Sequence, residues 1–247
     1  SKVVQDRVDE VNASYGSDQA ANLSQIQLLD KQWRTADKAE NNNDPLVSKA
    51  LNSEVASELS EFKDTFPENV EVFVTDKYGA NIAATNRTSD YYQADEAWWQ
   101  AAYNNGKGAV YIGQPEFDQS SKTFSFILAV PLYSHGTKEV SGVMRTTINI
   151  DSILAILNAK VLGGTGHTSL YLPKGQVLDA KNENGVRPTD PNALALLPEL
   201  TSTKTYDAFT LDGVPSVVSA AQVTSTDSEV QTGIKNLGWQ VVVSQSQ

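Results

Sequence analysis

An aromatic segment is the part of this sequence whose residue types and spacing best suit chemistry. It places Tyr91, Tyr92, Trp98 and Trp99 close together in an otherwise polar stretch, and Tyr111 follows in a predicted strand. Adjacent tryptophans on a short helix point about 100° apart, so one ring can enter the core while the other borders a cavity. Small-molecule pockets combine such rings with a few polar groups that orient the ligand. The segment therefore predicts either a ring-lined binding pocket or a purely structural aromatic plug.

Other residues that commonly carry chemistry are sparse. The two histidines, His135 and His167, stand beside glycines and are expected in solvated loops, without the converging ligands that a hydrolase or a metal site needs. Residues 163–166 lack the Lys-Ser/Thr of a phosphate-binding loop and are expected to form a linker turn. Residues 118–122 lack the full ligand pattern of a calcium loop and are expected to form a hairpin tip. The sequence therefore predicts no cofactor, no metal and no catalytic residue.

The composition narrows the function further. With 30 acidic and 19 basic residues the formal net charge is -11, which disfavours binding to nucleic acid or to anionic lipid surfaces. The absence of cysteine excludes thiolate metal sites, thiol nucleophiles and disulfides. No stretch approaches the ~18–20 consecutive apolar residues that cross a bilayer. The length of 247 residues suits one large domain or two domains of ~100–150 residues each.

Two helical segments open the chain and provide the first elements that must position the aromatic segment. From Lys2 to about Glu40 there is no proline, and apolar residues recur at helical spacing. This predicts a long helix, with the polar run 14–18 as the place for a bend. Asp44 at the N-cap and Pro45 at the first helical position predict a second helix that ends near Phe66.

The remainder shows one order of elements twice: a hairpin, a helical insert and a three-strand antiparallel run. The first half is predicted to contain strands at 70–75, 82–85, 109–113, 123–133 and 140–150, with a helix at 95–103. A helix at 151–157 is followed by the second half, with strands at 168–172, 176–180, 207–211, 214–223 and 239–244 and a helix at 192–197.

This repeat predicts an α+β fold with a long N-terminal helix and two tandem PAS-like modules, each built on a central antiparallel sheet. We expect a helical stalk with the second helix over residues 1–66, a first module over 67–160 and a second over 161–247. The junction between the modules is expected near residues 159–166.

The order and spacing of several short motifs resemble the double Cache (dCache) sensor domains of bacterial and archaeal receptors. The markers in the first half are Asp76-Lys-Tyr-Gly79, Tyr91, Asp95-Glu-Ala-Trp-Trp99, Gly108-Ala-Val-Tyr-Ile-Gly113, Pro131-Leu132 and Gly142-Val-Met-Arg-Thr-Thr147. Those in the second half are the run from Gly164 to Gly175 and Gly238-Trp-Gln-Val-Val-Val243. No single motif is specific, but together they cover essentially the whole chain.

The resemblance implies an extracytoplasmic sensor domain, periplasmic or extracellular, held between two membrane helices of a histidine kinase, chemoreceptor or cyclase. A small molecule would bind the membrane-distal module, and a conformational signal would pass to the C-terminal membrane helix. The resemblance implies no enzymatic activity for this segment, and it allows a homodimer through the N-terminal helix. The alternative is a secreted or exported binding protein or enzyme of similar fold without a signalling output.

The pocket of the family maps onto the aromatic segment and the strands that follow it. The positions that match the pocket of the family are Tyr91, Trp98, Trp99, Tyr111, Arg145 and Thr147. Glu96 is added because it stands at a ligand-binding position of the family, and Asp118 and Phe126 are added from their expected places on the strands. Family members that bind amino acids hold the carboxylate with an Arg where Glu96 stands and the amine with an Asp where Thr147 stands. These departures argue against an α-amino acid as the ligand.

The orientation of Arg145 decides the expected ligand charge. Side chains alternate along a strand, so Arg145 and Thr147 share one face. If that face lines the pocket, Arg145 can pair with the carboxylate of an organic acid. If it faces solvent, the acidic and aromatic site favours an amine or an uncharged ring, because a cation over a tryptophan face gains ~0.5–2 kcal/mol. The acidic residues near Trp98 favour the second alternative.

Overall fold

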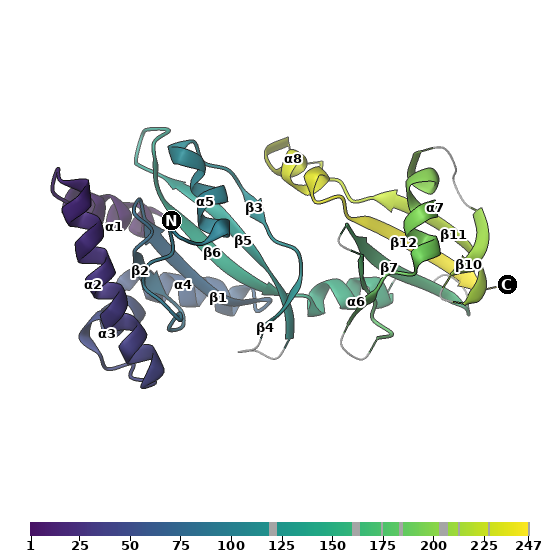
Figure 1. The fold of residues 1–247 in the computed structure, drawn as a ribbon, viewed down its shortest axis with the longest axis horizontal. Coiled ribbons are helices and arrows are strands. Elements are labelled where there is room, and N and C mark those ends of the chain that lie inside the picture. The colour runs from purple at the N-terminus through teal and green to yellow at the C-terminus, as the bar shows by residue number, and fades with distance from the viewer. Residues whose placement is uncertain are drawn as a thin grey trace. The chain divides into compact units, whose positions relative to one another are not determined.

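The computed structural model describes residues 1–118, 123–159, 164–173, 175–182, 185–202, 207–211, 213–226 and 228–246. The chain folds into two compact units, one of Ser1–Gly113 with Ile127–Ile148 and one of Gln114–Phe126 with Asn149–Gln247. Each unit combines helices with an antiparallel sheet (Figure 1). Most of the expected hairpin tip, residues 119–122, and residues 160–163 of the expected junction lie outside the described residues.

The expected long N-terminal helix is divided into two helices, α1 (Lys2–Ala13) and α2 (Gln19–Lys38). The break falls on the polar run 14–18, where Asp18 caps α2 by accepting the backbone N–H groups of Ala20 and Ala21. Within the break, the Tyr15 hydroxyl donates a hydrogen bond to Asp76 Oδ2 at 2.5 Å, and burial raises the pKa of the Asp76 carboxyl. The break therefore anchors the start of α2 to the sheet.

The second expected helix is also divided, into α3 (Pro45–Leu51) and α4 (Glu54–Thr65). Asp44 caps α3 by accepting the N–H of Leu46, as the sequence predicts. Ser53 then starts a new helix by accepting the N–H of Ala56. Two N-caps close together in sequence explain why one apolar stripe yields two helices.

The first sheet has the strand order β2-β1-β6-β5-β3, and β4 also pairs with β5. Its elements are β1 (Asn69–Asp76), β2 (Asn81–Ala84), β3 (Tyr111–Ile112), β4 (Glu116–Asp118), β5 (Thr123–Tyr133), β6 (Val140–Asn149), the helix α5 (Ala97–Tyr103) and the 3-10 turn η1 (Asn104–Gly106). Most of this sheet belongs to the first unit, whereas β4 and residues 123–126 of β5 belong to the second. Val72 and Val74 of β1 pack with α1 and α4, whereas Phe73 packs with α5. The alternation of β1 thus separates two cores on opposite faces of the sheet.

The sheet of the second unit has the order β10-β11-β12-β7-β8-β9, with every pairing antiparallel. Its elements are α6 (Asp151–Ala159), β7 (Gly166–Leu172), β8 (Gln176–Leu178), β9 (Val186–Pro188), α7 (Pro191–Ser202), β10 (Asp207–Leu211), β11 (Val214–Gln222), α8 (Ser228–Asn236) and β12 (Gln240–Ser246). β9 and α8 were not predicted. The α+β class with two antiparallel sheets is confirmed, and no described helix is both long and apolar enough to cross a membrane.

The expectation for His167 is wrong. This residue lies in β7 rather than in a solvated loop, and its side chain is only 17% exposed. Its Nε2 atom lies 2.8 Å from Asp179 Oδ1, and Asp179 Oδ2 accepts a hydrogen bond from Arg187 Nε at 2.9 Å. His135 does occupy an exposed turn, where its Nε2 lies 2.8 Å from Asp6 Oδ1.

Candidate ligand-binding site

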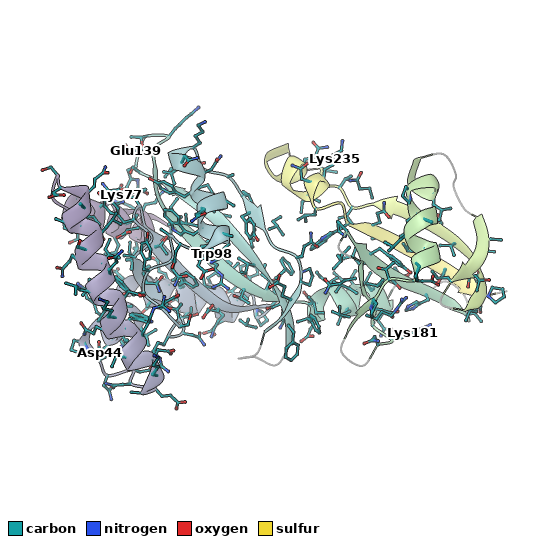
Figure 2. The ribbon with its side chains drawn as sticks, in the orientation of Figure 1. Asp44, Lys77, Trp98, Glu139, Lys181 and Lys235 are labelled. Atoms are coloured by element: carbon teal, nitrogen blue, oxygen red, sulfur yellow. The ribbon has the colours of Figure 1, made fainter. Side chains whose placement is uncertain are left out.

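Strand register gathers four side chains on one face of the first sheet. Phe73 of β1 is directly opposite Arg145 of β6, and Glu71 is opposite Thr147. Directly opposed residues of an antiparallel pair project from the same face. The helix α5 covers this face, and Trp98 lies between α5 and the sheet (Figure 2). Arg145 is therefore on the covered side of the sheet, together with Trp98.

Arg145 is held by aromatic rings on one side and by polar groups on the other. Its guanidinium carbon lies 5.2 Å from the centre of the Phe73 ring and 5.3 Å from that of Trp98. Its Nη1 lies 3.6 Å from Glu71 Oε2, and Nη2 donates a hydrogen bond to Thr147 Oγ1 at 3.3 Å. The side chains of Arg145 and Glu71 are 19% and 25% exposed. The site thus offers a half-buried cation and a half-buried anion side by side.

The two tryptophans of α5 are both buried, at 5% and 6% exposure, so neither is simply a surface ring. Trp99 stacks on Tyr103 with a centroid distance of 4.6 Å, and its Nε1–H donates to Thr75 Oγ1 at 2.9 Å. Tyr111 of β3 packs against the same cluster. A hydrogen-bonded indole and a stacked ring fix Trp99, which leaves Trp98 as the ring that faces the charged pair.

The structure brings Trp98, Trp99, Tyr111, Arg145 and Thr147 into this neighbourhood, and four other candidates lie elsewhere. Tyr91 packs against Trp33, with 5.7 Å between the ring centres, and Glu96 is exposed at the N-cap of α5. Phe126 belongs to the second unit, where its ring centre lies 5.9 Å from that of Trp239. Asp118 ends β4, and its side chain is outside the described residues. The acidic residue beside Arg145 is therefore Glu71 rather than Glu96.

Glu71 and Phe73 are site residues that the sequence alone did not predict. Both lie on a strand that alternates between polar and apolar positions, which is typical of any half-buried strand. The missing information was the register between β1 and β6, because only the pairing of Phe73 with Arg145 shows that the two positions meet. The alternation of residues 70–75 and the shared face of Arg145 and Thr147 indicated which side chains could line one face of the sheet. Neither pattern showed that the two strands are partners.

A second group of contacts ties α2 to the segment that leads into α5. Asp30 Oδ1 accepts the backbone N–H groups of Tyr91 and Tyr92 at 2.9 and 3.1 Å, and Asp30 Oδ2 accepts Arg34 Nε at 2.7 Å. Arg34 Nη2 also donates to Asp90 Oδ2 at 3.0 Å. Burial acts to raise the pKa of Asp30, but Arg34 and the two amides outweigh it and hold that pKa below its usual value.

Two further bonds complete this attachment, which we call the α2 clamp: Asp30, Trp33, Arg34 and Asp37 of α2 with residues 87–92. The Trp33 indole N–H donates to the Thr88 carbonyl at 2.7 Å, and Arg87 Nε donates to Asp37 Oδ1 at 2.8 Å. Trp33 is fully buried, so this bond replaces solvent for both partners. The clamp fixes the backbone that enters α5 and thereby positions Trp98.

Groups of metal-ligating side chains are absent from the part of the chain that the structure describes. There, no three His, Asp or Glu side chains converge closely enough to hold a metal ion. The chemistry that the site offers is instead noncovalent: a guanidinium, a carboxylate, a hydroxyl and two aromatic rings.

Comparisons with known proteins place this geometry in a known fold. No family model and no curated protein matches the sequence. The ligand-binding domain of the Campylobacter jejuni chemoreceptor Tlp3, in complex with 4-methylisoleucine, is similar with 13% identity and a TM-score of 0.55, over 99% of this chain and 91% of that chain. The ligand-binding domain of the Pseudomonas aeruginosa amino acid chemoreceptor PctC, in complex with GABA, has 17% identity and a TM-score of 0.53, over 91% of both chains.

The extracellular domain of rpHK1S-Z16, described as a histidine kinase, has 18% identity and a TM-score of 0.56, over 92% of both chains. Two of these structures are ligand-binding domains of chemoreceptors, and the third is the extracellular domain of a protein described as a histidine kinase. At these identities the likeness establishes the fold. The predicted fold is therefore confirmed as the fold of these three domains.

Proposed function

We propose that this chain is the extracytoplasmic ligand-binding sensor domain of a transmembrane receptor. The support is the fold, which is shared along nearly the whole chain with ligand-binding domains of chemoreceptors and with the extracellular domain described as that of a histidine kinase. In this proposal residues 1–66 form the stalk, 67–160 the membrane-distal module and 161–247 the membrane-proximal module. The segment itself binds and transmits, and catalysis belongs to a cytoplasmic kinase, cyclase or chemoreceptor output.

The ligand in this proposal binds at the face covered by α5, and the observation that carries it is Arg145 beside Trp98, Phe73 and Glu71. A ligand carboxylate would pair with the guanidinium of Arg145, and the neighbouring Glu71 carboxylate would pair with a ligand ammonium group. Both 4-methylisoleucine and GABA, the ligands of Tlp3 and PctC, carry these two groups. We therefore propose a small amino carboxylic acid as the ligand.

This proposal revises the sequence-based preference for an amine or an uncharged ring. That preference required Arg145 to face solvent and Glu96 to face the ligand, whereas Arg145 lies over the rings and Glu96 is exposed. The family positions that lack Arg and Asp remain Glu96 and Thr147. The two charges in this chain would instead come from neighbouring strands, Arg145 from β6 and Glu71 from β1.

A calorimetric comparison tests the proposal. A thermal-shift screen of GABA and the standard amino acids selects the ligand, because saturation at a hundred times Kd stabilises the native state by about 2.7 kcal/mol. Its affinity is then compared with those of the analogues that lack the amine or the carboxylate, which for GABA are butyrate and butylamine. A hydrogen bond to a charged group contributes about 1.5–3 kcal/mol. Arg145→Met should therefore lower the affinity for the ligand and for its acid analogue about 10- to 150-fold.

Glu71→Gln should weaken only the compounds that carry an amine. Arg7→Met is the matched control, because Arg7 pairs with Glu10 on the surface of α1, away from the site. Unchanged affinity in Arg145→Met, or an amine analogue that binds as tightly as the full ligand, would contradict the proposed site. The absence of any thermal shift across the screen would contradict the ligand class.

Signal transmission and oligomerisation are the remaining parts of the proposal. The C-terminal strand β12 would pass a ligand-dependent movement to a membrane helix that follows it, and two copies would associate through the N-terminal helix. Spin-label distances between exposed Lys2 and Gln245 should change when the selected ligand is added. An unchanged distance distribution at saturating ligand would count against transmission along this path.

A further inference from the structure

The second unit contains a cavity that the proposed ligand site does not use. It lies between α7 and the adjoining ends of β7 and β12 and has a volume of about 140 Å³. The residues that define its chemistry are Tyr171, Pro173, Leu194, Leu197, Pro198 and Gln240. An apolar cavity of about 150 Å³ is large enough to hold benzene. The space therefore suits one small ring.

The packing of α7 explains why this space is open. Ala193, Leu197 and Leu200 of α7 belong to the core that α7 forms on the sheet, with Val218 of β11. Leu194 lies on the flank of α7 beside the cavity and is 49% exposed. The helix contacts β10 and β11, and Tyr171 of β7 and Val242 of β12 belong to the same core. The open space lies beside Leu194, at the adjoining ends of β7 and β12.

A glycine keeps the opposite wall clear. Gly238 lines the cavity just before β12 and has a φ of +64°, which favours glycine. A Cβ at this position would lie 3.1 Å from the Pro173 ring. The wall on this side is therefore formed by the Gly238 backbone and the rigid Pro173 ring. Gly238 has no side chain that could fill the space, and the proline ring cannot change its position by rotating about a side-chain bond.

Most of the lining side chains are apolar, and Tyr171 and Gln240 carry polar groups. Gln240 is directly opposite Tyr171 across β12 and β7, so both side chains project from the face that α7 covers. Pro198 lies inside α7 and has no amide hydrogen, so it cannot donate the usual helical bond to the carbonyl of Leu194. None of the described residues that line the cavity is charged. A charged guest would be desolvated without an opposite charge, which is unfavourable.

We propose that this cavity is a second binding site, for a small uncharged ring compound with one hydroxyl group, of the size of phenol. The ring occupies the space between Leu194, Leu197 and the two prolines. The hydroxyl bonds the Gln240 side-chain amide at the rim. This site is in a different unit from Arg145 and binds its ligand independently of the ligand proposed there.

Calorimetry with phenol, cyclohexanol, toluene and benzoate tests the proposal, with amide NMR shifts of Tyr171 and Gln240 to locate the binding. Phenol and cyclohexanol should bind and shift these amides, and benzoate should not. Gln240→Leu should lower the affinity for phenol about two- to tenfold, because one uncharged hydrogen bond is lost. The affinity for toluene, which has no hydroxyl group, should not change.

Leu194→Trp should abolish phenol binding, because the larger side chain fills the cavity from its half-exposed position. Ile156→Trp is the matched control: Ile156 is 62% exposed on α6 of the same unit and does not line the cavity, so phenol binding should persist. Arg145→Met should also retain phenol binding, which separates this site from the first. No phenol binding to the unaltered chain, equal binding of benzoate, or unchanged phenol affinity in Leu194→Trp would each overturn the proposal.

Discussion

The α2 clamp predicts that Asp30 controls the order of the segment that enters α5. Asp30→Ala removes the acceptor of two backbone amides, those of Tyr91 and Tyr92, and the partner of Arg34. Bonds to a charged acceptor contribute about 1.5–3 kcal/mol each when buried. Asp30 is 15% exposed and Arg34 is 44% exposed, so we take about 1–1.5 kcal/mol for each amide and little for the ion pair. The expected local loss is about 2–3 kcal/mol.

Amide hydrogen exchange measures this loss directly. A local loss of about 2–3 kcal/mol corresponds to exchange about 30- to 150-fold faster at Tyr91 and Tyr92. Asp30→Asn keeps one acceptor oxygen and should show an intermediate effect. Affinity at the Arg145 site should also fall in Asp30→Ala, although Asp30 does not touch that site, because the clamp positions α5.

The control for this prediction is Glu61→Ala, which alters an exposed acidic residue on α4 outside the clamp. It should leave exchange at Tyr91 and Tyr92 unchanged. The reasoning is refuted if these two amides exchange at the same rate in Asp30→Ala and in the unaltered chain. It is equally refuted if the acceleration spreads evenly over the first unit, since that would indicate global rather than local destabilisation.

Two further predictions concern pH dependence and close backbone packing. Burial acts to raise the pKa of Asp179, but Arg187 and other partners hold it below its usual value, so its stabilisation is present above about pH 4 and is lost as the pH falls through the lowered pKa. Asp179→Asn should therefore lower the free energy of unfolding by about 2–3 kcal/mol at pH 7, and the difference in Tm between the variant and the unaltered chain should narrow towards pH 3. An equal difference in Tm at pH 7 and pH 3 would argue against this. A Cβ at Gly142 would lie 2.1 Å from the Thr75 carbonyl oxygen, so Gly142→Ala should lower the free energy of unfolding in urea by more than about 2 kcal/mol. Gly164 has open space around it, so Gly164→Ala should lower that free energy little. Equal unfolding midpoints for the two variants would contradict the close spacing of β1 and β6.

Local signals in the sequence determined much of the secondary structure. The strands 123–133 and 207–211 and the start of α3 at Pro45 have the bounds that alternation and capping predict. The elements that were missed have weak local signals. β4 and β9 are three-residue strands, and α8 is a polar helix at Ser228–Asn236. Their formation depends on neighbouring strands and packing rather than on local pattern.

The sequence also determined the chemical content of the site and its place in the first half, because a cluster of rings before a strand with an arginine is visible without a structure. It determined that Arg145 and Thr147 share a face, since strand side chains alternate. It did not determine which face α5 covers, nor that Phe73 and Glu71 are opposite these residues.

Only the tertiary structure decided the ligand charge that we propose and the clamp that positions the site. Arg145 meets Glu71 through strand register, and Asp30 meets Tyr91 and Tyr92 across a long separation in sequence. Such contacts depend on how whole elements pack, and packing is determined by the burial of all their apolar faces together. A local pattern can therefore indicate which residues are available for a site, whereas the fold decides which of them meet.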